Sequence, residues 1–373
     1  MDLKLYLFWV VNPTRFCFSP HMNFRQIKTK FKAGLVSIVQ IQTLLFASLG
    51  GVIFILLGLP IPLLIGPMIG CLIAALIGFR LEGFGILSIL MRTILGVAIG
   101  SSITPDILAE IGRLGFSLIL IPLFLIVVCS VGYVYFKGLG FDPNTSYYAT
   151  IPGGLVEMLL FGDKAGANVR ALSLIHATRV LVILLIVPFV VTSIWNINLT
   201  RPPGINLQQV PLQELGLMIF SAIAGWKLAA YLKISGATIL GPMVLTALLS
   251  LTGLITVRPP AEFIWSAQFF IGLGVGIRYS GVTGVEVRKY ILSALGYCFL
   301  LGVISILFTF TLVGLLHTSP IDTLLAYLPG GQAEMAIIAI VAEADVAYVI
   351  SHHVFRLILV LLLVQVVARW LLK

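Results

Sequence analysis

The chain carries very little charge. Lysine, arginine, aspartate and glutamate make up 10% of its 373 residues, whereas hydrophobic residues make up 60%. Charged residues supply about a quarter of a typical soluble domain, so this composition excludes a soluble fold. The apolar runs last about 20 residues, the length of a bilayer-spanning helix, and they lack the short alternating segments of a membrane β-barrel. We therefore expect an all-α polytopic membrane protein whose first partner is the lipid bilayer.

Cysteine and histidine are also scarce. The four cysteines have no CxxC spacing, and the five histidines form no HxH or HxxH motif. These absences argue against a disulfide framework and against a metal centre of clustered ligands. We expect no enzymatic activity, no metal and no cofactor. The net charge of +9 is typical of membrane proteins with basic cytoplasmic loops, so it does not require direct binding of nucleic acid.

The sequence is duplicated. Four motifs of the first half recur in the second half, in the same order and at a nearly constant spacing. The pairs are IGPMIG at Ile65 with LGPMVL at Leu240, ILGVAIG at Ile94 with FIGLGVG at Phe270, IPGGLVEM at Ile151 with LPGGQAEM at Leu328, and HATRVLVILLIV at His176 with HVFRLILVLLLV at His353. A fixed period of this kind indicates two copies of one structural unit.

The repeats divide the chain into four parts. We predict a first membrane repeat over residues 37–195, a polar and proline-rich linker over 196–210, and a second membrane repeat over 211–373. Residues 1–36 precede the first repeat and are rich in lysine and arginine. We expect a basic cytoplasmic extension there rather than a signal peptide, because no clear small-residue cleavage site follows its short apolar run.

Loop charges indicate how the repeats cross the membrane. Each repeat offers six hydrophobic segments. If all twelve crossed, seven basic residues would lie outside, against the positive-inside rule. If each Pro-Gly-Gly segment enters and leaves on one side, all seven lie inside: Lys164, Arg170, Lys227, Lys233, Arg278, Arg288 and Lys289. We predict inverted repeats of about five crossings plus one broken or re-entrant segment each, with both termini cytoplasmic, in the plasma (inner) membrane.

The Pro-Gly-Gly segments and the charges around them form the predicted binding site. Proline and glycine interrupt a helix, and a broken backbone at membrane depth survives where it is buried in protein or lines a watery cavity. Each segment is followed by a glutamate and then by a histidine and an arginine that share one helix face. The predicted residues are Pro152, Gly153, Gly154, Glu157, His176 and Arg179 in the first repeat, and Pro329, Gly330, Gly331, Glu334, His353 and Arg356 in the second.

Two interpretations of these charges remain open. Isolated charges in lipid cost several kcal/mol, so they face the protein interior and pair with one another. In the structural interpretation, a glutamate–arginine pair pins each broken segment to its neighbouring helix. In the functional one, the two sites face each other, the helix starts and arginines bind an anion, and a glutamate carries a coupling proton. Sodium coordination fits equally well, and His352 is expected to be a packing residue.

The double pattern GPM…PGG(x)2EM…H(x)2R resembles the AbrB membrane-protein family over roughly residues 40 to 370. This resemblance implies a role in regulating gene expression, and some family members are labelled putative ammonia monooxygenases. An oxygenase would need converging metal ligands, which the histidine pattern does not supply.

The sequence therefore favours a secondary transporter or exporter. We expect its substrate to be a small anionic or zwitterionic solute, coupled to protons or sodium. The alternative is a membrane protein with an indirect role in regulating gene expression. The expected partners are the solute, the coupling ion and, as an option that the sequence leaves open, a second copy of the chain in a homodimer.

Overall fold

The computed structural model describes residues 37–104, 111–234 and 236–371, and within these ranges the chain is helical, with no β-strand. The predicted all-α architecture is confirmed. The predicted extension at residues 1–36 and the last two residues of the second repeat lie outside the described residues.

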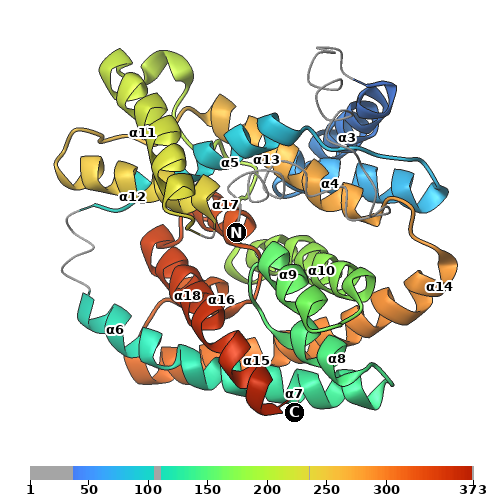
Figure 1. Cartoon of the computed structure of the whole chain (residues 1–373). Helices are drawn as coiled ribbons and strands as arrows, with labels where there is room; N and C mark the ends of the chain where they lie inside the picture. Colours follow the sequence, from blue (N-terminus) through green and yellow to red (C-terminus); the bar gives the residue numbers. More distant parts are fainter. Residues whose placement is uncertain (1–36, 105–110, 235, 372–373) are drawn as a thin grey trace.

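The helices lie in two layers (Figure 1). The first, upper in Figure 1, contains α3 (Ile38–Leu56), α4 (Pro62–Ile77), α5 (Gly85–Gly100), α11 (Leu212–Tyr231), α12 (Ala237–Leu251) and α13 (Ala261–Gly276). The second contains α6 (Ile111–Ile119), α7 (Ile121–Gly138), α8 (Pro143–Thr150), α9 (Leu155–Lys164), α10 (Val169–Trp195), α14 (Gly284–Glu286), α15 (Leu292–Leu316), α16 (Pro320–Tyr327) and α18 (Val346–Leu371). Helix α17 (Gln332–Val341) and the buried face of α10 join the core of the first layer. Three short turns complete the chain: η3 (Leu207–Gln209), η4 (Ile277–Tyr279) and η5 (Val287–Ile291).

Within the described residues, five helices are long and apolar enough to cross a membrane: Ile38–Leu56, Gly115–Gly138, Val169–Trp195, Gly284–Leu316 and Val346–Leu371. Others are shorter: α4, α5 and α13 have 16 residues each and α12 has 15. A 16-residue helix is about 24 Å long, less than the roughly 30 Å of a hydrocarbon core.

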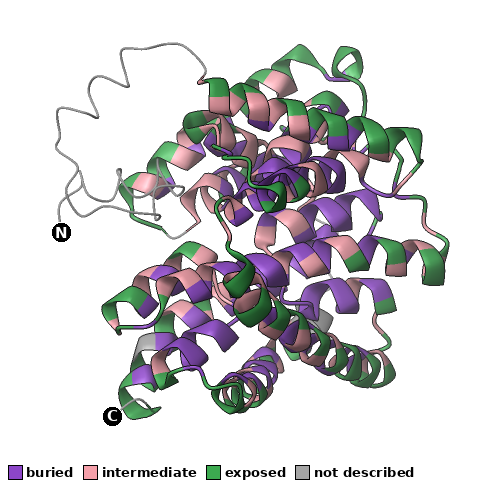
Figure 2. Ribbon diagram, turned by 90° about the vertical axis from the view of Figure 1, so that its right-hand side faces the viewer, coloured by how far each residue is buried: buried purple, intermediate pink, exposed green. Residues whose placement is uncertain are grey.

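Large apolar side chains cover the outside of the molecule. The outward faces of the ribbons are exposed in Figure 2, and the exposed side chains include Val134, Phe299 and Phe310, which are 71%, 72% and 74% exposed. Buried positions gather between the layers and include histidine and arginine side chains. Apolar outside and polar within is the arrangement expected of a protein whose solvent is lipid.

The first layer is assembled by close contacts between the two halves of the chain. Helix α5 packs on α12, and α13 packs on α4. Gly96 of α5 lies against the backbone of Ile239, and Gly272 of α13 lies against the backbone of Leu64. An added Cβ would lie 3.2 Å from the Ile239 carbonyl carbon in the first case and 2.9 Å from the Leu64 carbonyl carbon in the second. Only glycine allows these helices to approach so closely.

Two groups of loops lie at opposite ends of the long helices. At the first end, which we define as residues 77–85, 138–143, 164–170 and 276–290, Leu81 N donates to Ser280 Oγ at 3.1 Å and Arg170 Nε lies 2.7 Å from Glu286 Oε1. At the second end, defined as residues 56–62, 100–104, 195–212, 251–261, 316–323 and 341–346, Ile61 N donates to Leu199 O at 3.2 Å and Arg258 Nε to Ser102 Oγ at 3.2 Å.

Candidate functional site

Both Pro-Gly-Gly segments break a helix. Helix α8 ends at Thr150 and α9 begins at Leu155, while α16 ends at Tyr327 and α17 begins at Gln332. Proline cannot donate a helical hydrogen bond, and the following glycines make the break easy. We call residues 143–164 the first hairpin and residues 320–341 the second hairpin.

The start and the end of each hairpin lie side by side. In the first hairpin, Asn144 Nδ2 donates to Ala165 O at 2.6 Å. At the second, Asp345 N, just after α17, donates to Asp322 Oδ1 at 2.9 Å. Each hairpin therefore enters and leaves at one end of the molecule: the first hairpin at the first end and the second hairpin at the second end.

The predicted histidines and arginines hold the hairpins. His176 Nε2 lies 3.1 Å from Tyr148 O, and Arg179 Nη1 donates to Ile151 O at 3.2 Å. In the second half, His353 Nε2 lies 3.0 Å from Leu325 O, and Arg356 Nη1 donates to Leu328 O at 3.3 Å. All four contacts join residues 28 positions apart.

These contacts have a simple physical cause. The last carbonyls of α8 and α16 have lost their helical partners at the break, and a positive charge is favourable at a helix C-terminus. The arginine side chains are 3% and 4% exposed, so the carbonyl bonds also compensate for their desolvation. An arginine-to-carbonyl bond therefore pins each hairpin, and the glutamate–arginine pair stays a prediction.

The two glutamates lie over the start of their own helices. Glu157 and Glu334 stand three residues after Gly154 and Gly331, which are the N-caps of α9 and α17. An added Cβ would lie 2.9 Å from Glu157 Cδ at Gly154 and 2.8 Å from Glu334 Cδ at Gly331. Each carboxylate thus occupies the place beside a helix start where the sequence predicts an anionic ligand. The prediction that the two glutamates face each other stays a prediction.

The two halves differ in how completely these groups are satisfied. In the second half, Arg356 Nη2 lies 2.7 Å from His353 Nδ1 and 3.5 Å from Gly330 O. In the first half, His176 Nδ1 and Arg179 Nε are buried and have no hydrogen-bond partner among the described residues. Helix α10 therefore presents one open acceptor and one open donor beside the first hairpin, while the second hairpin has an open donor of its own, Gln332 Nε2.

Charges from both halves gather between the layers. The guanidinium groups of Arg179 and Arg356 repel each other electrostatically. The positive charge of Arg278, in η4, interacts electrostatically with His176. Arg278 also interacts with Glu334 and with Arg92 of α5. The hydroxyl of Tyr279 donates to Thr178 Oγ1 at 3.0 Å and holds η4 against α10. The predicted site thus has an excess of positive charge.

Arg92 and Arg278 were not among the predicted site residues. Arg92 lies in the apolar run SILMRTILGVAIG, and a charge inside a hydrophobic segment is a signal that could have revealed it. The corresponding place in the second half, aligned through Ile94 and Phe270, holds the neutral Gln268, so this charge does not recur. Arg278 was predicted in a cytoplasmic loop, whereas the structure continues α13 into η4 with buried residues on both sides.

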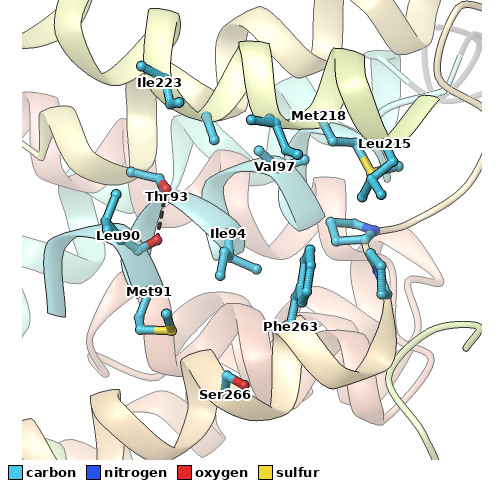
Figure 3. Close-up of a pocket in the computed structure, with 14 residues that line it drawn as sticks. Leu90, Met91, Thr93, Ile94, Val97, Leu215, Met218, Ile223, Phe263 and Ser266 are labelled. Atoms are coloured by element: carbon cyan, nitrogen blue, oxygen red, sulfur yellow. Dashed lines mark hydrogen bonds between the residues drawn. The ribbon is translucent and has the colours of Figure 1, made fainter. Parts of the chain in front are cut away.

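The structure also contains an apolar cavity, whose lining includes no charged side chain. It has a volume of about 420 Å³ and lies between α5, α11 and α13 (Figure 3). Its two polar side chains are Thr93 and Ser266, whose hydroxyls donate to Leu90 O and Glu262 O at 2.8 Å in each case. A cavity without free polar groups does not suit a charged solute.

The fold and the buried charges define the class of the protein: it is a multi-pass α-helical membrane protein. The chain belongs to the family described as "Transition state regulatory protein AbrB", which matches residues 29–372. The resemblance predicted from the repeated motifs is confirmed.

Two relatives support this assignment. The uncharacterized protein YhjN of Bacillus subtilis (strain 168) is 27% identical over 297 residues, which cover 74% of this chain and 76% of YhjN. The "Putative regulator AbrB" of Escherichia coli (strain K12) is 25% identical over 283 residues, which cover 75% of this chain and 81% of that protein. No solved structure matches the chain.

Proposed function

We propose that the protein is a secondary transporter or exporter of a small anionic or zwitterionic solute, coupled to protons or sodium. Its two repeats are inverted, each with about five crossings and one re-entrant hairpin, and both termini lie in the cytoplasm of a cell whose plasma (inner) membrane holds the protein. The proposal assigns the chain no enzymatic reaction and no cofactor.

The loop contacts support the inverted topology. Four of the loops that the positive-inside rule places in the cytoplasm meet at the first end, where Arg170 and Lys289 lie; the loop that follows α11 is not among them. The loops that it places outside meet at the second end, where Arg201 Nη1 lies 3.5 Å from Glu343 Oε1. The hairpins enter from opposite ends, as inverted repeats require. Helices α4, α5, α12 and α13 cross as short helices, which a locally thinned bilayer accommodates.

The open groups of α10 beside the first hairpin carry the proposal for the solute. Because His176 Nε2 faces a carbonyl, it bears the ring proton, and Nδ1 is left as an acceptor. Arg179 Nε is a donor. A buried donor and a buried acceptor without partners are costly unless a ligand satisfies them. A small carboxylate with a hydroxyl or ammonium group could bind both, and the surrounding arginines favour its negative charge.

Flux through proteoliposomes tests this proposal. The probes are radiolabelled hydroxycarboxylates and aminocarboxylates, offered to purified full-length protein under an inward proton or sodium gradient. We expect at least one to accumulate with the wild type and with the control Arg201→Gln, whose side chain is 62% exposed. Arg179→Gln should reduce uptake by about tenfold or more, since it removes a charged contact worth about 1.5–3 kcal/mol.

Two results would contradict the proposal. If the wild type moves no member of the panel above the level of empty liposomes, transport of this solute class is wrong. If Arg179→Gln and Arg201→Gln transport equally well, the protein is a transporter with a different site.

A regulatory role is the second candidate, and the names of the family and of the E. coli relative favour it. We propose that such a role is indirect and follows from the solute that is moved, because the described chain is built of membrane helices and short loops. Rescue of a deletion strain by Arg179→Gln would instead favour regulation that does not depend on transport.

A further inference from the structure

A buried hydrogen-bonded network joins α6 to α18 in the second layer. Ser117 Oγ lies 2.6 Å from Tyr348 Oη and 2.8 Å from His352 Nε2. Ser117, Tyr348 and His352 are 0%, 8% and 1% exposed. The sequence predicts His352 as a packing residue, but the structure places it at one end of this chain of polar groups.

The network has a direction. His352 Nδ1 lies 2.7 Å from the carbonyl oxygen of Tyr348, which can only accept, so Nδ1 bears the proton in the neutral ring. Nε2 is then an acceptor, and Ser117 must donate to it. The Ser117 oxygen in turn accepts from the Tyr348 hydroxyl. Every hydrogen bond in the row therefore points toward His352.

The other end of the network leads to acidic groups at the second end of the molecule. The hydroxyl of Thr323 and the carboxylates of Asp322 and Asp345 face Tyr348. Asp345 Oδ1 also accepts from Tyr348 N at 2.9 Å. Both aspartates are partly exposed, so they can exchange protons with water. Thr318 Oγ1, at 2.8 Å from Thr323 Oγ1, extends the hydroxyl row toward the surface.

His352 is linked to the proposed solute site through Arg356, whose charge acts on that of Arg179. Arg356 follows it by four residues, so both lie on one face of α18, and their charges interact. His353 and the Tyr327 ring, whose centroid lies 5.6 Å from the His352 ring, complete the groups that face it. Arg356 thus places a fixed positive charge beside the end of the row.

The first half has the same backbone geometry without the titratable groups. Asn168 N donates to Thr145 Oγ1 at 2.8 Å, as Asp345 N does to Asp322. When the halves are aligned through His176 and His353, the positions that correspond to Asp322, Asp345, Tyr348 and His352 hold Thr145, Asn168, Ala171 and Ile175. A row that can carry a proton is present at this place only in the second half.

We propose that this row, Tyr348–Ser117–His352, is a proton relay that couples transport to protons entering from the second end. The inference rests on the proposed function and selects the proton over sodium as the coupling ion. A proton delivered to Tyr348 Oη from the Asp322 side displaces the Tyr348 hydroxyl proton onto Ser117. The Ser117 proton then moves to His352 Nε2, and every hydroxyl regains one proton while the imidazole gains one charge.

Time-resolved infrared spectroscopy of the full-length protein in nanodiscs tests the relay without any solute. After a jump from about pH 8 to about pH 4, low enough to protonate an imidazole beside the positive charge of Arg356, we expect an imidazolium band in the wild type that is lost in His352→Gln. Ser117→Ala and Tyr348→Phe should slow the appearance of this band by about tenfold or more. The control is Ser293→Ala, the serine that corresponds to Ser117 when the halves are aligned through Ile94 and Phe270. Its hydroxyl bonds to Lys289 O, and the variant should behave as wild type. Equal rates in the wild type, Ser117→Ala and Tyr348→Phe would overturn the relay.

A second measurement separates the relay from the transport proposal. Proteoliposomes loaded with the pH dye pyranine report protons moved per labelled carboxylate. We expect Ser117→Ala and Tyr348→Phe to lower this ratio about tenfold, and an unchanged ratio would contradict the relay. If the wild type moves no carboxylate, the proposed function fails, while the infrared rates still decide whether the relay exists.

Discussion

The two hairpins are held by the same contacts, but the side chains that hold them have different additional hydrogen bonds. In both, a histidine and an arginine on the following long helix bind carbonyls at the break, over the same separation of 28 residues. In the second half these side chains also bind each other, and titratable groups extend from them toward the surface. In the first half the histidine and the arginine each have a buried atom, His176 Nδ1 and Arg179 Nε, without a partner among the described residues, whereas the open buried donor of the second half belongs to Gln332.

This difference suggests a division of labour. The frame around the hairpins, formed where α5 packs on α12 and α13 packs on α4, is symmetric. In the first half, the histidine and the arginine keep buried atoms that a ligand can satisfy. In the second half, the corresponding arginine makes further hydrogen bonds and so anchors its hairpin. We expect equivalent mutations in the frame to have similar effects in the two halves. Equivalent mutations of the histidines and arginines should mainly affect binding in the first half and stability in the second.

The largest expected effect is on stability, and it should differ between Arg356→Ala and Arg179→Ala. Arg356→Ala removes charged hydrogen bonds to Leu328 O, Gly330 O and His353 Nδ1, each worth about 1.5–3 kcal/mol. Arg179→Ala removes one such bond, to Ile151 O. Melting temperatures of the detergent-purified variants should fall much further for Arg356→Ala. Equal losses would show that the second hairpin is not the stronger anchor.

The next effect concerns the frame, where the halves should agree. Gly96→Ala and Gly272→Ala each force a methyl group against the backbone of the facing helix, at Ile239 and Leu64. Overpacking of this kind costs about 1–3 kcal/mol. Gly274→Ala is the matched control on α13, because no atom lies within 4 Å of its added Cβ. The melting temperature should fall similarly for the first two and stay unchanged for the control. A lower melting temperature in only one of the two variants would contradict a symmetric frame.

The smallest effect is expected at the N-cap glycines. Gly154→Ala and Gly331→Ala place a methyl group where the carboxylate of Glu157 or Glu334 lies. The carboxylate is the far end of a flexible side chain, so it can move, and the stability cost should stay within about 1 kcal/mol. Solute affinity should change more for Gly154→Ala, since the first hairpin is the proposed binding half. A larger change for Gly331→Ala would reverse the assignment of the halves.

Local features of this structure were predictable from sequence. Proline and glycine act through their own backbone, so PGG at residues 152–154 and 329–331 predicts the two breaks directly. The spacing of His176 to Arg179 and of His353 to Arg356 places each pair on one helix face. The apolar composition predicts the all-helical membrane architecture.

Contacts between distant segments were not predictable. Nothing in the sequence near His352 points to Ser117, which lies 235 residues away and meets it only when α6 packs on α18. Nor does spacing show that Arg356 binds His353 while Arg179 leaves its Nε open, because rotamers and packing decide this. Arg92 has no counterpart in the second half, so the sequence did not mark it as a site residue. Its role became visible only in the structure, where its charge interacts with Arg278, which also interacts with Glu334.

The most direct test compares His176→Gln with His353→Gln. Glutamine Nε2 can still donate to the carbonyls of Tyr148 and Leu325, but the acceptor at Nδ1 is lost in both variants. Ligand-induced shifts of the melting temperature with the transported carboxylate measure binding, and the unliganded melting temperature measures stability. We predict that His176→Gln loses the shift and keeps its stability, whereas His353→Gln keeps the shift and melts earlier. The same outcome for both variants would contradict the division between a binding hairpin and an anchoring hairpin.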